Sequence, residues 1–259
     1  MLSDRVSPAG RAVKTEHIEI REDSRASLSQ LPHARKLPCD TCPGRSLGVC
    51  SPLDDLRLAH LLALGGRRHW AKREFIYRAG DPMQMIYKII TGIVVESRML
   101  YDGRRQIVGI RTTGDLCGYP ENRGRYLFSG EALTEVEACA FDKRKFDALV
   151  AGHVDMACAL ADDTSRKLER ASENLTVMGQ LISTERVAHF VVEIGELNAS
   201  RQIDTDPLKL HLTRQEIGDY LGLTLETVSR SFTRLRQLRI LALVGTDAVA
   251  ILDRKRLHA

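Results

Sequence analysis

Residues 213–241, with the sequence TRQEIGDYLGLTLETVSRSFTRLRQLRIL, constrain the fold of this chain more strongly than any other stretch. They predict two short amphipathic helices joined by a tight turn. In the first helix, Ile217, Tyr220 and Leu221 recur at helical spacing, so they share one apolar face. Gly222 follows directly, at a position where a left-handed residue ends a helix at little cost.

The second helix is expected to begin after Thr224, because a threonine hydroxyl at that position can accept a hydrogen bond from the first turn. Its apolar residues also lie on one face: Val228, Phe232, Leu235 and Leu238. Gly218 in the first helix leaves room for another helix to approach closely. We therefore expect the two helices to pack around a common core.

The opposite face of the second helix carries groups suited to reading DNA bases. Glu226, Ser229 and Arg230 fall at i, i+3 and i+4, so they project together from its first turns. A guanidinium can bond guanine through two hydrogen bonds, a carboxylate can accept from cytosine, and a hydroxyl adapts to several bases. Contacts to the DNA backbone are assigned to the neighbouring hydroxyls and cations: Thr213, Thr224, Thr227, Arg234, Arg236 and Arg239.

The stretch therefore predicts a helix-turn-helix whose second helix enters the major groove of double-stranded DNA. The alternative is an ordinary helical hairpin with a solvated charged face. The two glycines, the cap and the polar trio together disfavour that alternative.

Length, charge and motifs limit the function classes. The 259 residues suffice for two domains with their own cores, and the net charge of +4 is too small to indicate nucleic-acid binding by itself. Residues 209–259, however, hold nine basic and five acidic side chains, which concentrates the positive charge in one C-terminal module. The chain shows no nucleophile–base pair, no phosphate-cradling glycine loop and no metalloprotease spacing, so we do not expect an enzyme.

The chain has no apolar run of the ~20 residues that span a bilayer. Its N-terminus lacks a basic segment followed by an apolar one, which is typical of secretion signals. We therefore expect a cytoplasmic protein without a membrane partner, in a compartment where thiols stay reduced.

Three cysteines, Cys39, Cys42 and Cys50, fall within the turn-rich sequence PCDTCPGRSLGVC. Tight turns let closely spaced thiolates converge on one metal centre. The expected compartment disfavours a disulfide, and a zinc knuckle stays open as an interpretation. Three ligands need a fourth from elsewhere, for which the candidates are Cys117, Cys139 and Cys158, with a histidine as a weaker choice.

Residues 51–65 predict a short leucine-rich helix, and residues 70–150 change to short apolar runs separated by turns. Short strands at this spacing predict an antiparallel roll or barrel. Asp102-Gly103, between the apolar runs 93–100 and 106–110, predicts a β-hairpin.

Residues 155–182 predict one long helix. Its apolar positions alternate by three and four residues and form a seam of the coiled-coil type: Leu168, Ala171, Leu175, Met178 and Ile182. The seam can pack on its own roll or against a second copy. We favour a homodimer, because helix-turn-helix proteins commonly read two-fold sites. Ala171 and the polar Thr164 make the seam thin, so we expect a marginal dimer that is open to regulation.

The sequence LALVGTDAVAILD follows the helix-turn-helix and predicts two strands around Gly245-Thr246-Asp247, which form a wing. The expected fold class is α+β. The chain then divides into a mobile N-terminal segment (1–36), a cysteine cluster loop (37–52), a sensory β-roll domain (53–154), a dimerisation helix (155–183) and a winged helix-turn-helix DNA-binding domain (184–259).

This order of elements resembles the bacterial family of the cyclic-AMP receptor protein and the fumarate–nitrate reduction regulator (Crp/Fnr), over roughly residues 55–255. The most specific parts are QEIGDYLGLTLETVSR and GDLCGYP. Nucleotide-binding members carry an Arg-Ser/Thr-Ala triplet late in the roll, where this chain reads YLFSGEAL. The resemblance thus implies a cyclic-nucleotide-binding-like roll without its nucleotide site. The recognition face LETVSR, with Leu225 where the cyclic-AMP type has an Arg, resembles that of the oxygen-responsive branch. The spacing between Cys42 and Cys50 resembles that of its rhizobial relatives and indicates the FnrN subgroup.

In that branch, an N-terminal cysteine cluster and one cysteine of the roll hold a [4Fe-4S] cluster. The ligands implied by the resemblance are Cys39, Cys42, Cys50 and Cys139. The resemblance also implies a regulator that dimerises while the cluster is intact, binds TTGAT-N4-ATCAA operators and contacts RNA polymerase to control anaerobic and microaerobic genes. Arg230 would then read the G, Glu226 its paired C, and Ser229 a neighbouring T.

Two other regulators of the same fold are alternatives. One senses a haem-bound gas, with Cys117 or His153 as a haem ligand. The other uses its cysteines as a zinc site or as a thiol switch, in which Cys117 and Cys158 are the free thiols that would be oxidised.

Overall fold

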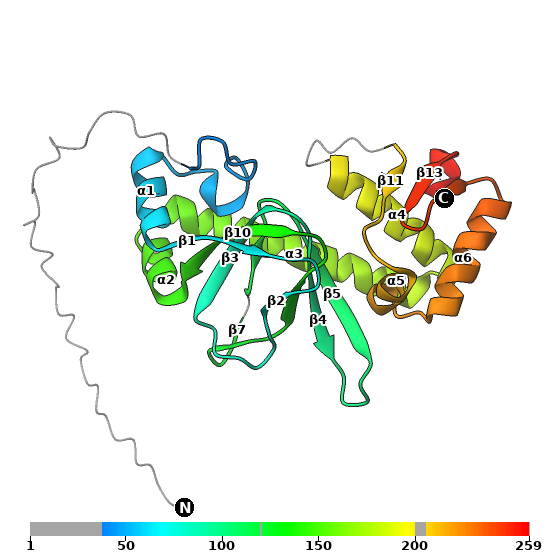
Figure 1. Ribbon diagram of the computed structural model, residues 1–259, viewed down its shortest axis with the longest axis horizontal. Coiled ribbons are helices and arrows are strands. Elements are labelled where there is room, and N and C mark those ends of the chain that lie inside the picture. The colour runs from blue at the N-terminus through cyan, green and yellow to red at the C-terminus, as the bar shows by residue number, and fades with distance from the viewer. Residues whose placement is uncertain (1–37, 120, 200–205, 259) are drawn as a thin grey trace, which may run out of the picture. The chain divides into compact units, whose positions relative to one another are not determined.

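The computed structural model describes residues 38–119, 121–199 and 206–258, in an α+β arrangement (Figure 1). The N-terminal segment that we expect to be mobile, residues 1–36, lies outside the described residues. No helix in the described ranges combines the length and the apolar character needed to cross a membrane.

Two four-stranded antiparallel sheets form the roll that the spacing of short apolar runs predicts. The first sheet has the order β1 (Gly65–Trp70), β10 (Val136–Asp142), β3 (Met85–Thr91), β6 (Leu116–Cys117). The second has the order β2 (Phe75–Tyr77), β9 (Ser129–Ala132), β4 (Val94–Met99), β5 (Arg105–Arg111), and a small ribbon pairs β7 (Glu121–Asn122) with β8 (Arg125–Tyr126). The predicted hairpin is confirmed: β4 and β5 pair, and Gly103 between them has a φ of 83°.

Four helical segments accompany the roll: η1 (Gly48–Cys50), α1 (Asp55–Ala63), α2 (Lys143–Ala151) and α3 (Val154–Gln180). Aspartate side chains cap the N-termini of α1 and α2: Asp54 accepts a hydrogen bond from the Arg57 amide, and Asp142 accepts one from the Lys145 amide. Because Asp142 is also the last residue of β10, that strand runs directly into α2.

The helix α3 (Figure 1) has a buried N-terminal part and a C-terminal part with exposed leucines. Near its start, Met156 is fully buried in the core of the roll and Leu160 packs beside it. Further along, Leu168 and Leu175 are 67% and 69% exposed. The first half of α3 therefore packs on its own roll, and the second half presents the expected seam to solvent.

The seam is shorter than the sequence periodicity predicts, because Ile182 is not part of α3. The helix ends at Gln180, and Leu181 has extended backbone with a ψ of 144°. The Ile182 amide instead donates to a Glu185 carboxylate oxygen at 3.0 Å, at the start of α4 (Ser183–Ala199). A new helix start thus interrupts the apolar repeat, and the helical seam ends at Met178.

The core of the C-terminal domain lies around α4, α5 (Arg214–Leu221) and α6 (Leu225–Gln237), and it is continuous with four buried residues of the roll: Val95, Ile107, Ile110 and Leu133. The predicted wing is confirmed as β12 (Leu241–Val244) and β13 (Ala248–Ile251), with Gly245 at a φ of 61° in the turn. A third strand, β11 (Leu208–Lys209), pairs with β13, and α7 (Arg254–Leu257) follows the wing.

Candidate functional site

Side-chain caps fix both helices of the helix-turn-helix. The Thr213 hydroxyl accepts from the Glu216 amide at 3.2 Å, and a Glu216 carboxylate oxygen accepts from the Thr213 amide at 2.8 Å. Gly222 ends α5 in left-handed conformation, with φ 65° and ψ 36°. The Thr224 hydroxyl accepts from the Thr227 amide at 3.2 Å and starts α6. The caps expected at Gly222 and Thr224 are therefore confirmed.

Gly218 permits a close approach, but its close neighbour is the turn and not another helix. A Cβ at this position would lie 2.5 Å from the Leu223 carbonyl oxygen. The backbone closes there, since the Leu223 amide donates to the Gly218 carbonyl at 3.0 Å. Gly218 therefore sets the tightness of the turn between α5 and α6.

The variant Gly218→Ala is expected to destabilise the protein by about 1–3 kcal/mol, because the added methyl group overpacks a backbone carbonyl that cannot move freely. The melting temperature measured by calorimetry should fall by several degrees. Gly66→Ala is the control, since its added Cβ meets nothing within 4 Å. Equal melting temperatures for the two variants would contradict this account of the turn.

The polar trio lies on the outer face of α6 as its spacing predicts. Glu226 and Arg230 are exposed and Ser229 is half-buried, while Val228 and Phe232 face the core. The backbone N–H of Glu226 and the Thr224 hydroxyl hold the pKa of the Glu226 carboxyl below its usual value, and Arg230 adds to this. Glu226 is therefore ready to accept a hydrogen bond as an anion.

Exposed cations surround this face on α6, the segment after it and α7: Arg234, Arg236, Arg239, Arg254 and Lys255. The hydroxyls of Thr213 and Thr224 accept the cap hydrogen bonds described above, and the Thr227 hydroxyl lies 3.1 Å from that of Thr224. Residues that read bases in a groove need such a cationic border, because phosphate contacts set the register of the protein on DNA.

The roll contacts the helix-turn-helix directly. Arg73 pairs with Glu216, the capping residue of α5, and also with Glu131 at 3.3 Å. The Gln106 amide donates to the Tyr220 carbonyl oxygen at 3.2 Å. Sequence reasoning did not identify the two contacts between the roll and the helix-turn-helix, Arg73–Glu216 and Gln106–Tyr220, which join residues more than a hundred positions apart.

The second candidate site is a cluster of thiols at the surface of the first sheet. Cys39, Cys50 and Cys139 are buried, and Cys42 is half-buried. Burial, together with the neighbouring Cys50 and Cys42, raises the pKa of the Cys139 thiol to about 12. Burial also raises the pKa of Cys39 and of Cys50, again with contributions from the other cysteines. The four thiols thus lie close enough to influence one another.

The other two cysteines lie elsewhere. Cys117 is fully buried in β6, where burial and the nearby Glu96 raise its pKa well above the usual value. Cys158 is exposed on α3. Of the three cysteines that the spacing leaves open as a fourth ligand, Cys139 is the one that lies among the loop cysteines, which contribute to its raised pKa.

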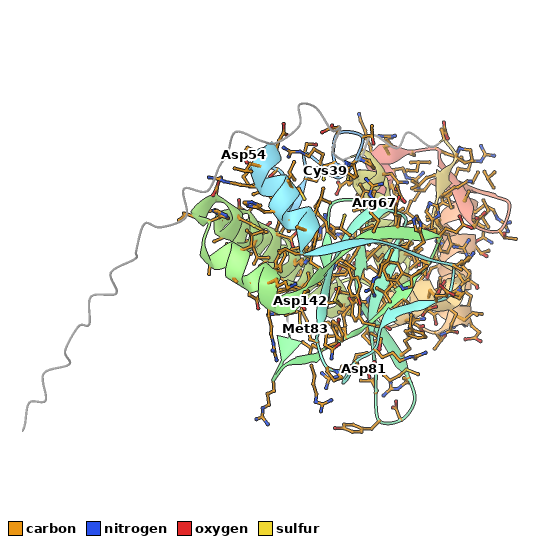
Figure 2. All side chains as sticks on the ribbon, turned by 60° about the vertical axis from the view of Figure 1, so that its left-hand side comes forward. Cys39, Asp54, Arg67, Asp81, Met83 and Asp142 are labelled. Atoms are coloured by element: carbon orange, nitrogen blue, oxygen red, sulfur yellow. The ribbon has the colours of Figure 1, made fainter. Side chains whose placement is uncertain are left out.

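Three cations hold the cysteine loop, residues 38–53. The Lys88 ammonium donates to the Gly44 carbonyl at 2.5 Å, and the Arg67 guanidinium donates to the Pro38 carbonyl at 2.6 Å. Arg45 donates to carbonyls within the loop itself, including that of Cys50 at 2.6 Å. Figure 2 labels Arg67 on β1 and Cys39 on the loop.

Strand register places two of these cations beside the roll cysteine. Cys139 on β10 pairs with Arg67 on β1 and with Lys88 on β3. Sequence reasoning missed both residues. The one available signal was Lys88 itself, a single cation within the apolar run MIYKIIT.

The four thiols do not meet at one point in the structure. Among the described residues, no three His, Cys, Asp or Glu side chains meet closely enough to hold one metal ion. A zinc site needs about four ligands around a single ion, whereas a [4Fe-4S] cluster binds its cysteines through different irons. Cysteine thiolates are ligands of both kinds of centre, so zinc stays an alternative to the cluster at these thiols.

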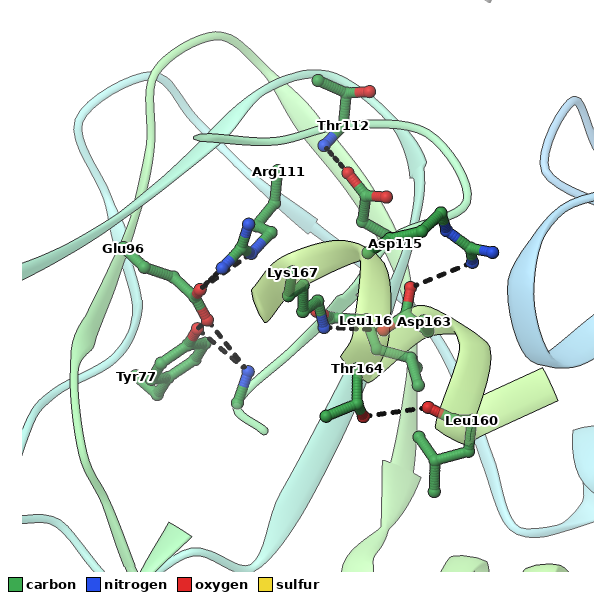
Figure 3. A network of polar contacts seen from close by, with 12 residues as sticks. Tyr77, Glu96, Arg111, Thr112, Asp115, Leu116, Leu160, Asp163, Thr164 and Lys167 are labelled. Carbon is green, nitrogen blue, oxygen red and sulfur yellow. Dashed lines mark hydrogen bonds and ion pairs between the residues drawn. The ribbon is translucent and has the colours of Figure 1, made fainter. Parts of the chain in front are cut away.

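The thiol cluster is linked to α3 in two ways. The segment η1, which ends at Cys50, packs directly against α3. In the sheet, Lys88 pairs with Leu116, whose carbonyl accepts a hydrogen bond from Lys167 on α3 at 2.8 Å (Figure 3). An ion pair between Arg57 and Asp155 joins α1 to the start of the same helix.

A cavity of about 320 Å³ lies between the roll, α3 and the helix-turn-helix. Three cations line it: Arg111, Lys167 and Arg170. The buried Arg111 is already paired with Glu96 at 2.8 Å, and Glu96 also accepts from the Tyr77 hydroxyl at 2.7 Å (Figure 3). From the YLFSGEAL segment, the cavity is lined by Phe128, an uncharged side chain. Arg111 is therefore not available to a nucleotide phosphate.

Two domain models match this chain. The Crp-like helix-turn-helix domain matches residues 185–259, and the cyclic nucleotide-binding domain matches residues 67–153. Together they cover the roll and the DNA-binding domain described above.

Several bacterial proteins are similar to this chain over most of their own length. The nitrogen fixation regulation protein FixK of Bradyrhizobium diazoefficiens is 33% identical over 85% of this chain and 92% of its own. The transcriptional activator protein FnrL of Cereibacter sphaeroides is 31% identical over 85% of this chain and 90% of its own. The solved structure of FixK2 from Bradyrhizobium japonicum has a TM-score of 0.67 and 31% identity, and covers 75% of this chain and 96% of that one.

Proposed function

Since the chain belongs to the Crp/Fnr family of DNA-binding transcriptional regulators, we propose that it is a member that responds to oxygen. In this proposal, a [4Fe-4S] cluster is held by Cys39, Cys42, Cys50 and Cys139. The observation that carries the proposal is the gathering of these four thiols beside two strand cations, at a surface that packs against α3. The protein works on the chromosome and hence in the cytoplasm.

A cluster bound there supplies a redox-reactive centre that oxygen can degrade. The residues of the chain do the rest. With its cysteines tied to Cys139, the loop stays on the sheet, where Lys88 and Arg67 hold its carbonyls. The packing of η1 against α3 then keeps that helix in place for dimerisation. A bias of a few kcal/mol between the tied and the released loop is enough for such a switch.

Two recognition helices of a dimer meet half-sites about one turn of DNA apart. We propose TTGAT-N4-ATCAA as the operator, with Arg230 reading the G, Glu226 its paired C and Ser229 a neighbouring T. No cyclic nucleotide is required, because the one buried arginine at the cavity is neutralised by Glu96.

The proposed output is control of anaerobic and microaerobic genes through RNA polymerase. The tip of the β4–β5 hairpin is a candidate surface for that contact, since Met99 is 65% exposed and Tyr101 is fully exposed. Tyrosine and methionine are enriched at protein–protein interfaces, so their exposure on this hairpin tip is consistent with a contact to another protein.

The experiment that tests the function is an absorption spectrum with iron and sulfide assays on protein purified without oxygen, followed by titration with air. We expect a broad visible band, about four irons per chain and bleaching in air. Zinc in place of iron, or colourless metal-free protein, would leave a DNA-binding regulator without a cluster. A haem Soret band would indicate the gas-sensing alternative.

Dimerisation through α3 predicts that Leu175→Glu yields a monomer. Burial of a leucine stabilises by about 1.5–3 kcal/mol, and a dimer contains two copies, so its loss should weaken association at least roughly a hundredfold. Sedimentation velocity of the oxygen-free protein measures this directly. Leu56→Glu is the control, because Leu56 is another exposed leucine, on α1 and outside the seam. A Leu175→Glu protein that stays dimeric would place the interface elsewhere.

A further inference from the structure

Lys88 is a buried cation that forms no ion pair with a carboxylate in the part of the chain that the structure describes. It is only 2% exposed. The oxygen that accepts a hydrogen bond from its ammonium is the Gly44 carbonyl oxygen. An uncompensated buried charge is strongly unfavourable, so a fold that retains one needs a nearby negative charge in its functional state.

The groups that surround Lys88 indicate where that charge arises. Lys88 lies close to the Cys50 thiol and beside Cys139, its register partner on β10. On the other side of Cys139, Arg67 is already paired with Glu137 at 3.2 Å. The two cations beside Cys139 therefore differ, because only Lys88 lacks a carboxylate.

Four cysteine thiolates carry more negative charge than an iron–sulfur core carries positive charge, so a cysteine-bound cluster is an anion. An anionic centre held by these cysteines supplies the negative charge that Lys88 lacks among the described carboxylates, so it accounts for the burial of this cation.

We propose that Lys88 is the counter-cation of the cysteine-bound centre. This inference rests on the function proposed above. Lys88 acts as a positioning residue in two ways: its hydrogen bond to Gly44 holds the cysteine loop on the sheet, and its charge stabilises the anionic centre. A cation at this position also favours the addition of an electron, so it raises the reduction potential of the centre. Arg67 supplies a weaker contribution of the same sign.

A neutral variant of similar length, Lys88→Met, tests both roles. In oxygen-free, reconstituted protein, we expect a more negative reduction potential in a titration followed by absorbance, and less iron and sulfide per chain. In protein without metal, we expect faster alkylation of Cys50 by iodoacetamide, measured by mass spectrometry, because the loop has lost its link to β3. Arg68→Met is the matched control, since Arg68 is the exposed neighbour of Arg67 on β1 and pairs with Ala138.

The outcomes separate this inference from the function on which it rests. Wild-type protein without iron would overturn both. Wild-type protein with a cluster, together with an unchanged potential and iron content in Lys88→Met, would overturn the role of Lys88 alone. If Lys88→Met does not fold, Arg67→Met replaces it, because Arg67 is about one-third exposed. Its potential should move in the same direction by a smaller amount, and an unchanged potential would contradict the proposal.

Discussion

Arg230→Ala is expected to weaken binding to the TTGAT-N4-ATCAA operator by about 1–3 kcal/mol per half-site, hence at least roughly 30-fold for a dimer. The reason is the loss of a guanidinium that can bond guanine through two hydrogen bonds from the exposed face of α6. The fold should be preserved, because within the described ranges the side chain of Arg230 makes just one hydrogen bond, a long one of 3.4 Å to the Thr227 hydroxyl.

The measurement is fluorescence anisotropy at matched salt, with the operator and with a duplex in which the G·C pair is replaced. Arg234→Ala is the control, an exposed arginine one turn further along α6. It should weaken binding to both duplexes alike and reduce the salt dependence, as expected for a phosphate contact. Arg230→Ala should instead lose the preference for the operator. Undiminished preference in Arg230→Ala would remove it from the base-reading face.

The helix-turn-helix was predictable because its determinants are local. The caps at Thr224 and Gly222 lie next to the residues that they serve, and one period of 3.6 residues orders each apolar face. The same holds for the hairpin at Asp102-Gly103. In each case, the interacting groups are within a few residues of one another.

The end of α3 was not predictable from periodicity. The apolar repeat continues through Ile182, but the amide of that residue serves the start of α4 by bonding to Glu185. The helices α3 and α4 follow each other so closely in sequence that their apolar residues form one continuous repeat. The extended backbone at Leu181 separates the two helices. Periodicity reports which residues share a face and does not report where a helix stops.

The cations beside the thiol cluster could not be predicted from the sequence either, for a different reason. Arg67, Cys139 and Lys88 form one row only because β1, β10 and β3 are adjacent and in that register. Strand order in an antiparallel roll is a non-local property. The cysteines themselves could be proposed from spacing and resemblance, but the cations that hold their loop could not.

Cys139→Ser is expected to remove most of the iron from oxygen-free protein, because it deletes the one ligand that the roll contributes to the proposed cluster. Serine keeps the size of the side chain and its place on β10, so the sheet should be preserved, while a hydroxyl is a poor substitute for the thiolate that binds iron. Iron and sulfide per chain, with the visible absorption band, measure the loss. Cys158→Ser is the matched control, since Cys158 is an exposed thiol on α3 outside the cluster.

The same variant tests whether the cysteine loop controls the dimer. Without a tie to Cys139, the loop keeps its hydrogen bonds from Lys88 and Arg67 and the buried contacts of Val49 and Leu53. The packing of η1 on α3 should then weaken, and sedimentation should show mainly monomer where the wild type is dimeric. Full iron content in Cys139→Ser would assign the fourth ligand to another residue. Lost iron with an unchanged dimer and unchanged operator affinity would instead keep the cluster site but reject its coupling to α3, since the tie would then have no effect on the helix that it contacts.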